Sequence, residues 1–444
     1  MSFFFLILYL IGFYIRPGEL FLFLGPFRIM LVLGVITILL TGFKVVSEPN
    51  RNLRAPQIFL MALFTAMIVL SPLTQGWFGG TVRALVRFGD TAMAFFLVAL
   101  NLTSLRRMRV MASFMVILTL VLVVQGILAY HFGFMQERLV YQQSRYWEAK
   151  GGTAPNLEES ESDDTSSTGH LKRMTALGLM NDPNDLAQGI LTVLPFVGMA
   201  WRRRQPMRNL VLVIFPLLLF MYGLYLTHSR TGELGLLVLA ALAFRERLGN
   251  IGSGILTGML LLGITAVNFS GGREISSREG SARGRLDAWA AGLSMLRSSP
   301  VWGVGYGGFV DHHERTAHNS YVLCFAELGL AGYFVWLSLL IVTIIIIARI
   351  RKIPVEEDED EEFRRWAKCI GLGLYGFLVA AFFLSRTYTD TLYLVLGMAT
   401  ALVCLVRRAG KPLEFPPLRY VVPVVGLVEV GSIIAVFVLV RGYL

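Results

Sequence analysis

Long apolar segments recur along the whole chain and end at short clusters of arginine and lysine. Thirteen such segments can be delimited, at 3–15, 27–43, 57–74, 88–104, 109–130, 183–201, 208–226, 231–246, 250–269, 319–348, 367–386, 390–406 and 420–440. A helix needs about 20 apolar residues to cross a bilayer, and several of these segments are shorter than that. We therefore predict an all-α integral membrane protein with about 12–13 transmembrane helices.

The basic residues between the segments predict the orientation of the chain. With the N-terminus inside, the expected inner loops carry 22 Lys or Arg residues, whereas the short outer loops carry only six. Cytoplasmic loops are enriched in basic residues in this way. Two long loops then face outward, and all six histidines lie on or near that face. The resulting division is 1–130 (N-terminal helices), 131–182 (first long outer loop), 183–269 (central helices), 270–318 (second long outer loop) and 319–444 (C-terminal helices, with an acidic inner linker at 349–366).

Composition agrees with this class and excludes others. Hydrophobic residues make up 55% of the chain and charged residues 16%, against about 25% charged residues in soluble proteins. The net charge of +10 does not indicate a nucleic-acid partner, because the arginines flank apolar segments instead of forming a patch. Three cysteines within or beside apolar segments do not form a disulfide framework. The first apolar segment lacks a basic leader and is expected to be a retained helix.

The loops differ in character. Residues 151–169 are acidic, rich in Ser and Thr and nearly devoid of apolar residues, so we expect a mobile segment. The acidic run 356–362 is expected to be a solvated linker. By contrast, apolar residues recur at helical spacing through 286–296, which predicts a short amphipathic helix on the outer membrane surface. Asp182 before Pro183 predicts a helix start, with Asp185 completing its cap.

Two arginines are candidates for binding an anionic group. Arg230 lies in the tight outer turn THSRTGEL (227–234), where it can be either an interface anchor or a ligand for phosphate oxygens. Arg285 opens the amphipathic helix, with Arg283 beside it and Trp289 one turn on as an expected interface anchor. A generic basic surface patch is the alternative for this pair.

Two further motifs follow in the second outer loop and the span after it. The segment VWGVGYGGF (301–309) can expose backbone amides to an anion, although it lacks the spacing of a nucleotide-binding loop. His318 stands at the end of the loop, directly before a long apolar segment. Gly329 and Gly332, one helical turn apart, predict close packing of another helix and hence a rigid mount for this histidine.

These motifs resemble the O-antigen ligase and O-antigen polymerase superfamily. The resemblance rests on THSRTGELG (227–235), RLDAWAAGLSMLRSSPVWGVGYGGF (285–309) and HNSYVLCFAELGLAG (318–332), and extends over about 175–345 in the order of the family. It implies transfer of a glycan from undecaprenyl pyrophosphate, on the periplasmic face of a bacterial inner membrane, with no metal and no other cofactor. For the ligases the acceptor is lipid A-core. The acidic segment 151–169 has no counterpart in the family pattern.

The resemblance also implies roles for single residues. Arg230 and Arg285 would hold the donor pyrophosphate and His318 would serve the acceptor. The remaining expected substrate-binding residues are Arg283, Asn319, Trp289 and Tyr306.

Three rival functions were weighed. A polymerase would use a second lipid-linked glycan as acceptor, and the sequence does not separate it from a ligase. A ligase that glycosylates proteins would usually carry an extra C-terminal region. A lipid-linked-oligosaccharide flippase or other transporter would place charges at mid-membrane and show repeated halves, neither of which is evident. We also find no pair of carboxylates suited to glycoside hydrolysis and no metal-site spacing among the histidines.

Overall fold

The described residues fold into a bundle of long helices with one two-stranded antiparallel β-sheet. The computed structural model describes residues 1–15, 29–47, 54–141, 172–266 and 280–442. Within them the helices are α1 (Ser2–Ile15), α3 (Ile29–Ser47), α4 (Pro56–Thr74), α5 (Phe78–Asn101), α6 (Leu105–Phe132), α7 (Gln136–Leu139), α9 (Pro183–Val197), α10 (Pro206–Asn209), α11 (Phe215–Leu226), α12 (Arg230–Ala266), α13 (Gly280–Ser298), α14 (Phe309–His312), α15 (Ser320–Ile350), α16 (Asp358–Ala381), α17 (Asp390–Arg408) and α18 (Leu418–Arg441). The short elements are the 3-10 helices η3 (Gly178–Met180) and η4 (Gly198–Ala200), the π-helix η5 (Leu210–Ile214), and strands β1 (Val140–Tyr141) and β2 (Arg173–Met174).

The predicted class, an all-α membrane protein, is confirmed. Within the described residues, eight helices are long and apolar enough to cross a membrane. The segment expected at 231–246 and the described part of the one expected at 250–269 lie on either side of a kink in α12 at Gly249, where φ is 69° and the backbone is not helical. The total of 12–13 spans stays a prediction, because α1 and α9 are short helices of 14 and 15 residues.

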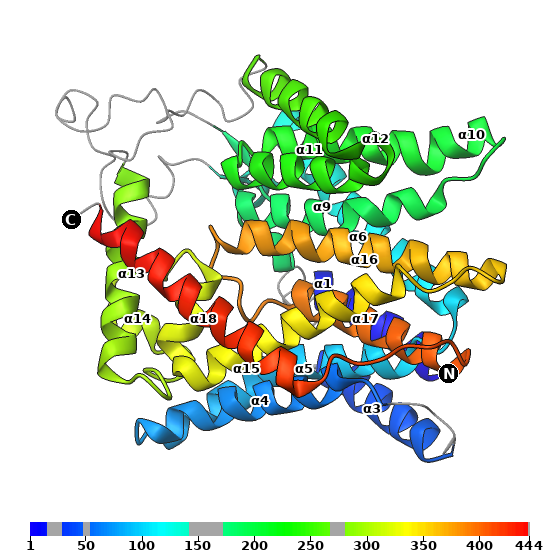
Figure 1. Cartoon of the computed structure of the whole chain (residues 1–444). Helices are drawn as coiled ribbons and strands as arrows, with labels where there is room; N and C mark the ends of the chain where they lie inside the picture. Colours follow the sequence, from blue (N-terminus) through cyan, green and yellow to red (C-terminus); the bar gives the residue numbers. More distant parts are fainter. Residues whose placement is uncertain (16–28, 48–53, 142–171, 267–279, 443–444) are drawn as a thin grey trace.

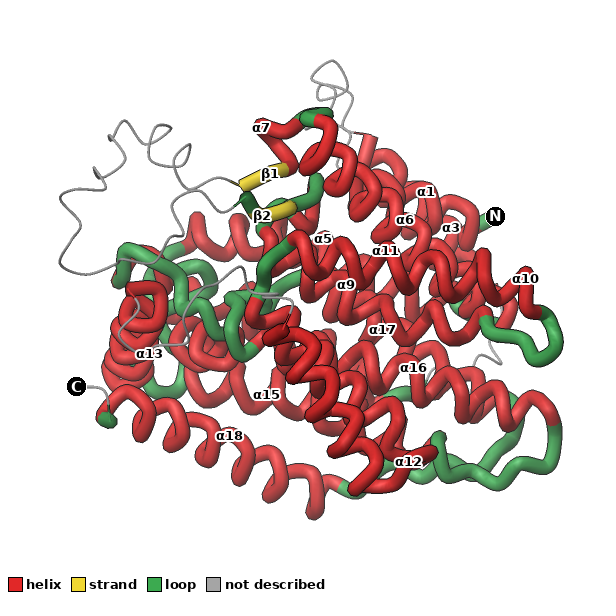
Figure 2. The backbone as a smooth tube through the Cα atoms, turned by 90° about the horizontal axis from the view of Figure 1, so that it is seen from above, coloured by secondary structure: helices red, strands yellow, loops and turns green. Residues whose placement is uncertain are grey.

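The bundle has an enclosed centre and a lipid-like exterior. In an apolar 18-residue stretch of α17, 83% of the residues are buried inside the protein. The corresponding share is 22% in α18 and 17% in α3. α17 packs on α5 and α16, whereas α18 lies along the outside of the bundle (Figure 2). Large apolar side chains such as Phe43 on α3 and Leu427 on α18 are about three-quarters exposed, at 75% each. Exposed apolar surface of this extent is what a membrane-facing helix requires.

One end of the bundle gathers the loops that were expected on the inner face. Glu246 forms ion pairs with Arg351 and with Lys368, the latter at 2.5 Å. Arg407 donates a hydrogen bond to the carbonyl of Arg54 at 2.8 Å. Loops assigned to the same face by their basic residues therefore do lie together.

The acidic run 356–362 is exposed to solvent at five of its seven residues, as expected, but it is not a linker. Its last five residues begin α16, which opens with a reciprocal capping box between Glu357 and Asp360. Asp360 is fully buried and accepts a hydrogen bond from Lys411 Nζ at 3.0 Å. Acidic residues at a helix start are stabilised by the exposed amides and the helix dipole, and this accounts for the run.

The opposite end carries the outer elements. α13 crosses the ends of the long helices beside α14 (Figure 1). Its bounds confirm the amphipathic helix predicted from the apolar spacing. β1 and β2 pair antiparallel, with Val140 opposite Met174. The acidic segment 151–169, expected to be mobile, lies outside the described residues.

Candidate functional site

His318 lies at the outer end of the bundle, directly before Asn319, the N-cap residue of α15, and its backbone has a φ of 49°. Left-handed backbone is uncommon for a residue with a side chain and is concentrated at functional sites. The side chain is half-buried, and the charges of Arg285, Asp182, Arg315 and Arg386 act on it. Burial first, and then the positive charge of Arg285, lower the pKa of His318 below its ordinary value of 6.5. The imidazole is therefore neutral at neutral pH and able to accept a proton.

Asn319 fixes the start of the helix that follows His318. Its Oδ1 accepts hydrogen bonds from the amides of Tyr321 at 2.9 Å and Val322 at 3.2 Å, as an N-cap residue does. The residue is fully buried, and its Nδ2 has no hydrogen-bond partner among the described residues. Capping is thus the role that the contacts define, and the expected contact with substrate stays a prediction.

Trp289 holds the backbone just before His318. It is 6% exposed, and its indole Nε1 donates to the carbonyl of Ala317 at 3.0 Å. Its ring packs edge-on against Phe382, with centroids 5.5 Å apart. This corrects the expected interface anchor: the indole is inside the protein, because α13 packs with this face on α15. The hydrogen bond joins the helix of Arg285 to the segment of His318.

An ion pair that the sequence did not reveal lies beneath His318. Arg386 donates to both carboxylate oxygens of Asp185, from Nε to Oδ1 at 2.5 Å and from Nη2 to Oδ2. The Arg386 amide also donates to Ser320 Oγ at 2.8 Å, and Thr387 Oγ1 donates to the Ser320 carbonyl at 2.6 Å. Asp185, expected as part of a helix cap, instead ties α9 to the segment between α16 and α17. Asp182 makes the predicted cap by accepting from the amide of Asn184 at 2.8 Å.

The turn that carries Arg230 is anchored to the same end of α9. Ser229 Oγ donates to Asn184 Oδ1 at 2.8 Å. Arg173, a second residue that sequence reasoning missed, donates to Asn184 Oδ1 and to the carbonyl of Thr227, at 3.0 Å in both cases. Asn184 is two residues from Asp182, whose charge reaches the imidazole of His318. The Arg230 turn and the His318 segment therefore meet at the start of α9.

The glycine-rich segment 301–308 packs into a break in α15. At Gly329, φ is 63° and ψ is −168°. The freed backbone groups bond to the glycine-rich segment: the amide of Leu330 donates to the carbonyl of Pro300 at 2.8 Å, and the amide of Gly305 donates to the carbonyl of Glu327 at 2.9 Å. A Cβ on Gly329 would lie 2.3 Å from the Val301 carbonyl oxygen. The expected close packing of another helix at Gly329 is therefore wrong, because a loop backbone occupies that place.

Gly332 does not support helix packing either, since the atoms nearest to a Cβ there belong to Leu328 of the same helix. Glu327, which sequence reasoning did not single out, is 3% exposed and accepts a hydrogen bond from the amide of Phe309 at 3.3 Å. The segment between 301 and His318 is thus fixed at its glycine-rich start by main-chain and side-chain bonds from α15.

Tyr306 belongs to a second cluster. Its amide donates to Ser71 Oγ at 3.0 Å, and its ring lies edge-on to Tyr388 at 4.8 Å. Burial, together with the charge of Glu327, raises the pKa of Tyr306 to about 12. The described contacts tie Tyr306 to α4 and Tyr388, and the group of charges around His318 does not include it. Its expected role in substrate binding stays a prediction.

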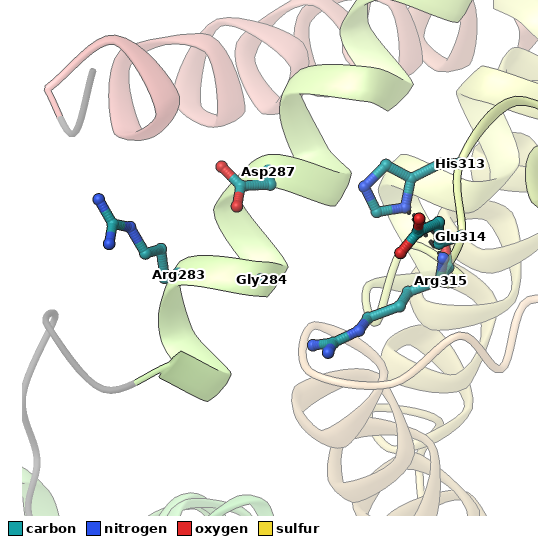
Figure 3. Close-up of a pocket in the computed structure, with 6 residues that line it drawn as sticks. All are labelled: Arg283, Gly284, Asp287, His313, Glu314 and Arg315. Atoms are coloured by element: carbon teal, nitrogen blue, oxygen red, sulfur yellow. Dashed lines mark hydrogen bonds between the residues drawn. The ribbon is translucent and has the colours of Figure 1, made fainter. Parts of the chain in front are cut away.

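His312 and His313 lie at the end of α14, in the second long loop. His312 ends α14, and its Nδ1 bonds to the Gly308 carbonyl at 2.9 Å. His313 Nδ1 bonds to the Arg315 carbonyl at 2.8 Å. Arg283, on the exposed side of α13, shares a polar cavity with His313 and Arg315 (Figure 3).

The fold and the site define a class: a multi-pass membrane protein with arginines and a neutral histidine converging at one end of its helices. Residues 215–337 match the family described as O-antigen ligase. This match supports a place in the O-antigen ligase superfamily, whose proteins are glycosyltransferase-like enzymes. The matched segment includes Arg230, Arg285, His318 and the break at Gly329. No curated protein matches the chain in sequence.

Proposed function

We propose that the protein is an O-antigen ligase that transfers a glycan en bloc from undecaprenyl pyrophosphate to a sugar hydroxyl of lipid A-core. The reaction would take place on the periplasmic face of the bacterial inner membrane. The family match supports glycosyl transfer from a lipid-linked glycan in a membrane. The clustering of inner-loop basic residues at the end opposite His318 supports the orientation, because cytoplasmic loops are the basic ones.

The proposed step is a single displacement. The acceptor hydroxyl oxygen attacks the anomeric carbon, the bond from that carbon to the pyrophosphate oxygen breaks, and the electron pair leaves with the lipid pyrophosphate. His318 accepts the hydroxyl proton, which its lowered pKa allows because the imidazole is neutral. Arg285 and Arg230 stabilise the charge on the departing phosphate, since the planar guanidinium matches phosphate oxygens.

One observation carries the proposal: within the family-matched segment, a neutral histidine on left-handed backbone lies in the field of Arg285. The turn of Arg230 is tied to the same place through Asn184 and Ser229. A base for the nucleophile and cations for the leaving group are the two elements that this displacement needs. Both belong to rigid elements, which is how catalytic groups are held to the required accuracy.

The test is reconstitution of the purified full chain with an undecaprenyl-pyrophosphate-linked glycan and with lipopolysaccharide that lacks O-antigen. We expect release of undecaprenyl pyrophosphate together with extension of the lipopolysaccharide, both dependent on the acceptor. Lengthening of the lipid-linked glycan in the absence of lipopolysaccharide would instead identify a polymerase. Failure to release undecaprenyl pyrophosphate with either acceptor would refute glycosyl transfer from this donor.

A further inference from the structure

A polar cavity of about 290 Å³ lies at the outer end of the molecule, beside the His318 segment. It opens between the first turns of α13 and the segment that follows α14. Its lining residues are Arg283, Gly284, Asp287, His313, Glu314 and Arg315. Figure 3 shows Arg283 and Asp287 on the helix, the 313–315 segment across from it, and the Arg315 side chain reaching toward the helix.

The charges of this cavity balance. Arg283 and Arg315 contribute two positive charges, and Asp287 and Glu314 contribute two negative charges. A site for pyrophosphate needs an excess of positive charge, as Arg230 and Arg285 would provide. A balanced mixture of guanidinium donors and carboxylate acceptors instead suits a neutral ligand rich in hydroxyl groups, because every hydroxyl both donates and accepts. The chemistry of the lining therefore favours a sugar ring over a phosphate.

The cavity faces away from Arg285, although the same helix carries both. Arg283 and Asp287 are four residues apart and share one face of α13. Arg285 is about 200° around the helix from Arg283, at about 100° per residue, and is on the face of Trp289. Gly284 leaves room for the opposite wall, because a Cβ there would lie 2.8 Å from Arg315 Nη1.

The position of the cavity beside His318 indicates whether it would bind a sugar of the donor or of the acceptor. Arg315 lines the cavity and also acts electrostatically on His318. In a displacement at the anomeric carbon, the acceptor approaches from the side opposite the leaving pyrophosphate. The acceptor sugar is therefore the substrate part that lies beyond His318 and away from the arginines that hold phosphate. We propose that this cavity is the subsite for a sugar of the acceptor glycan, an inference that rests on the proposed function.

The experiment compares Asp287→Ala and Glu314→Ala with the wild-type chain in steady-state transfer. Both side chains are exposed, so the variants should fold, which size-exclusion chromatography checks. Lipopolysaccharide lacking O-antigen is varied at saturating lipid-linked donor, and the donor is then varied at saturating acceptor. Glu137→Ala is the matched control, because Glu137 is an exposed carboxylate of the outer element α7 and does not line the cavity.

We expect the acceptor KM to rise at least about tenfold in each cavity variant, as loss of one charged hydrogen bond gives, with the donor KM and kcat within twofold of wild type. The control should match wild type in all three constants. An acceptor KM within twofold of wild type in both cavity variants would overturn the subsite, and so would a rise in the donor KM instead.

A binding measurement separates this inference from the proposed function. Delipidated core oligosaccharide, released from the same lipopolysaccharide, is titrated calorimetrically into the full chain without donor. We expect Asp287→Ala to weaken binding at least about tenfold. Equal binding by wild type and variant would overturn the subsite even if transfer proceeds normally. Failure of the wild type to release undecaprenyl pyrophosphate would refute the proposed function without altering the comparison of binding.

Discussion

Replacement of Gly329 by alanine tests how the break in α15 supports the site. The backbone here has φ 63° and ψ −168°, a region that is essentially restricted to glycine and costs other residues about 1–3 kcal/mol. The new Cβ would also lie 2.3 Å from the Val301 carbonyl oxygen. Relief of that overlap requires the two backbones to separate, which breaks the hydrogen bond from the amide of the buried Gly305 to the carbonyl of the buried Glu327. Each of these two groups is then left unsatisfied, at about 1–3 kcal/mol.

Together these effects amount to about 3–9 kcal/mol of destabilisation. At an unfolding entropy of about 2.1 cal/mol/K per residue, this lowers the Tm of a 444-residue chain by about 3–10 °C. The assay is thermal unfolding of purified variants in detergent, followed by tryptophan fluorescence. Gly263→Ala in α12 is the control, because a Cβ at that position meets nothing within 4 Å. Equal Tm values for Gly329→Ala and wild type would refute the described packing of the glycine-rich segment.

Three further outcomes are expected. Arg230→Lys and Arg285→Lys should each lower the transfer rate roughly a hundredfold, about 3 kcal/mol, because an ammonium lacks the paired donors of guanidinium. Wild-type rates for these variants in a quantitative complementation assay would contradict pyrophosphate binding. Trp289→Phe keeps the aromatic packing but loses the hydrogen bond, about 1 kcal/mol, and should lower kcat about fivefold at unchanged expression; an unchanged kcat would argue against positioning by the indole. In a chain with its native cysteines replaced, a cysteine at Ser298 should react with an impermeant reagent in spheroplasts and one at Asp358 should not, and the reverse pattern would overturn the orientation.

Local sequence signals predicted the features that depend on neighbouring residues. Apolar spacing gave α13 and its end at Ser298, and Asp182 before Pro183 gave the start of α9. The interruption of α12 at Gly249 falls between two apolar segments that were separated on sequence alone. These features follow from periodicity and from the capping preferences of single residues.

Features that depend on distant partners could not be predicted in this way. Gly329 was interpreted as a helix-packing residue, because the sequence does not reveal that the carbonyl of Val301 would approach it. Tryptophan is a residue type typical of membrane-interface anchors, but the indole of Trp289 is held inside the protein by the carbonyl of Ala317, 28 residues away. Arg386 and Asp185 are 201 residues apart, and only the folded chain joins them.

The candidate site likewise contains residues that the motifs predicted and residues that only the folded chain brings together. Resemblance to the family gave Arg230, Arg285 and His318. In the structure the charges of Arg285 and Asp182 act on His318. Asn184 and Arg173, which the motifs leave out, hold the turn that precedes Arg230. Such supporting residues make backbone and side-chain contacts that many residue types can make, so they leave no recognisable spacing. Tyr306 was included because it lies within a motif, yet its described contacts belong to another cluster.

The most direct test of the central claim, that His318 is the general base, is the pH dependence of transfer by wild type and by His318→Gln. Because burial and Arg285 lower the pKa of His318, the wild-type rate should fall in acid with a midpoint below pH 6.5, as the imidazole becomes protonated and can no longer accept the proton. His318→Gln should fold, still bind donor, transfer at least about 100-fold more slowly and lose this acid limb. A glutamine variant that works at more than about a third of the wild-type rate, with the same pH profile, would show that the residue only orients the acceptor.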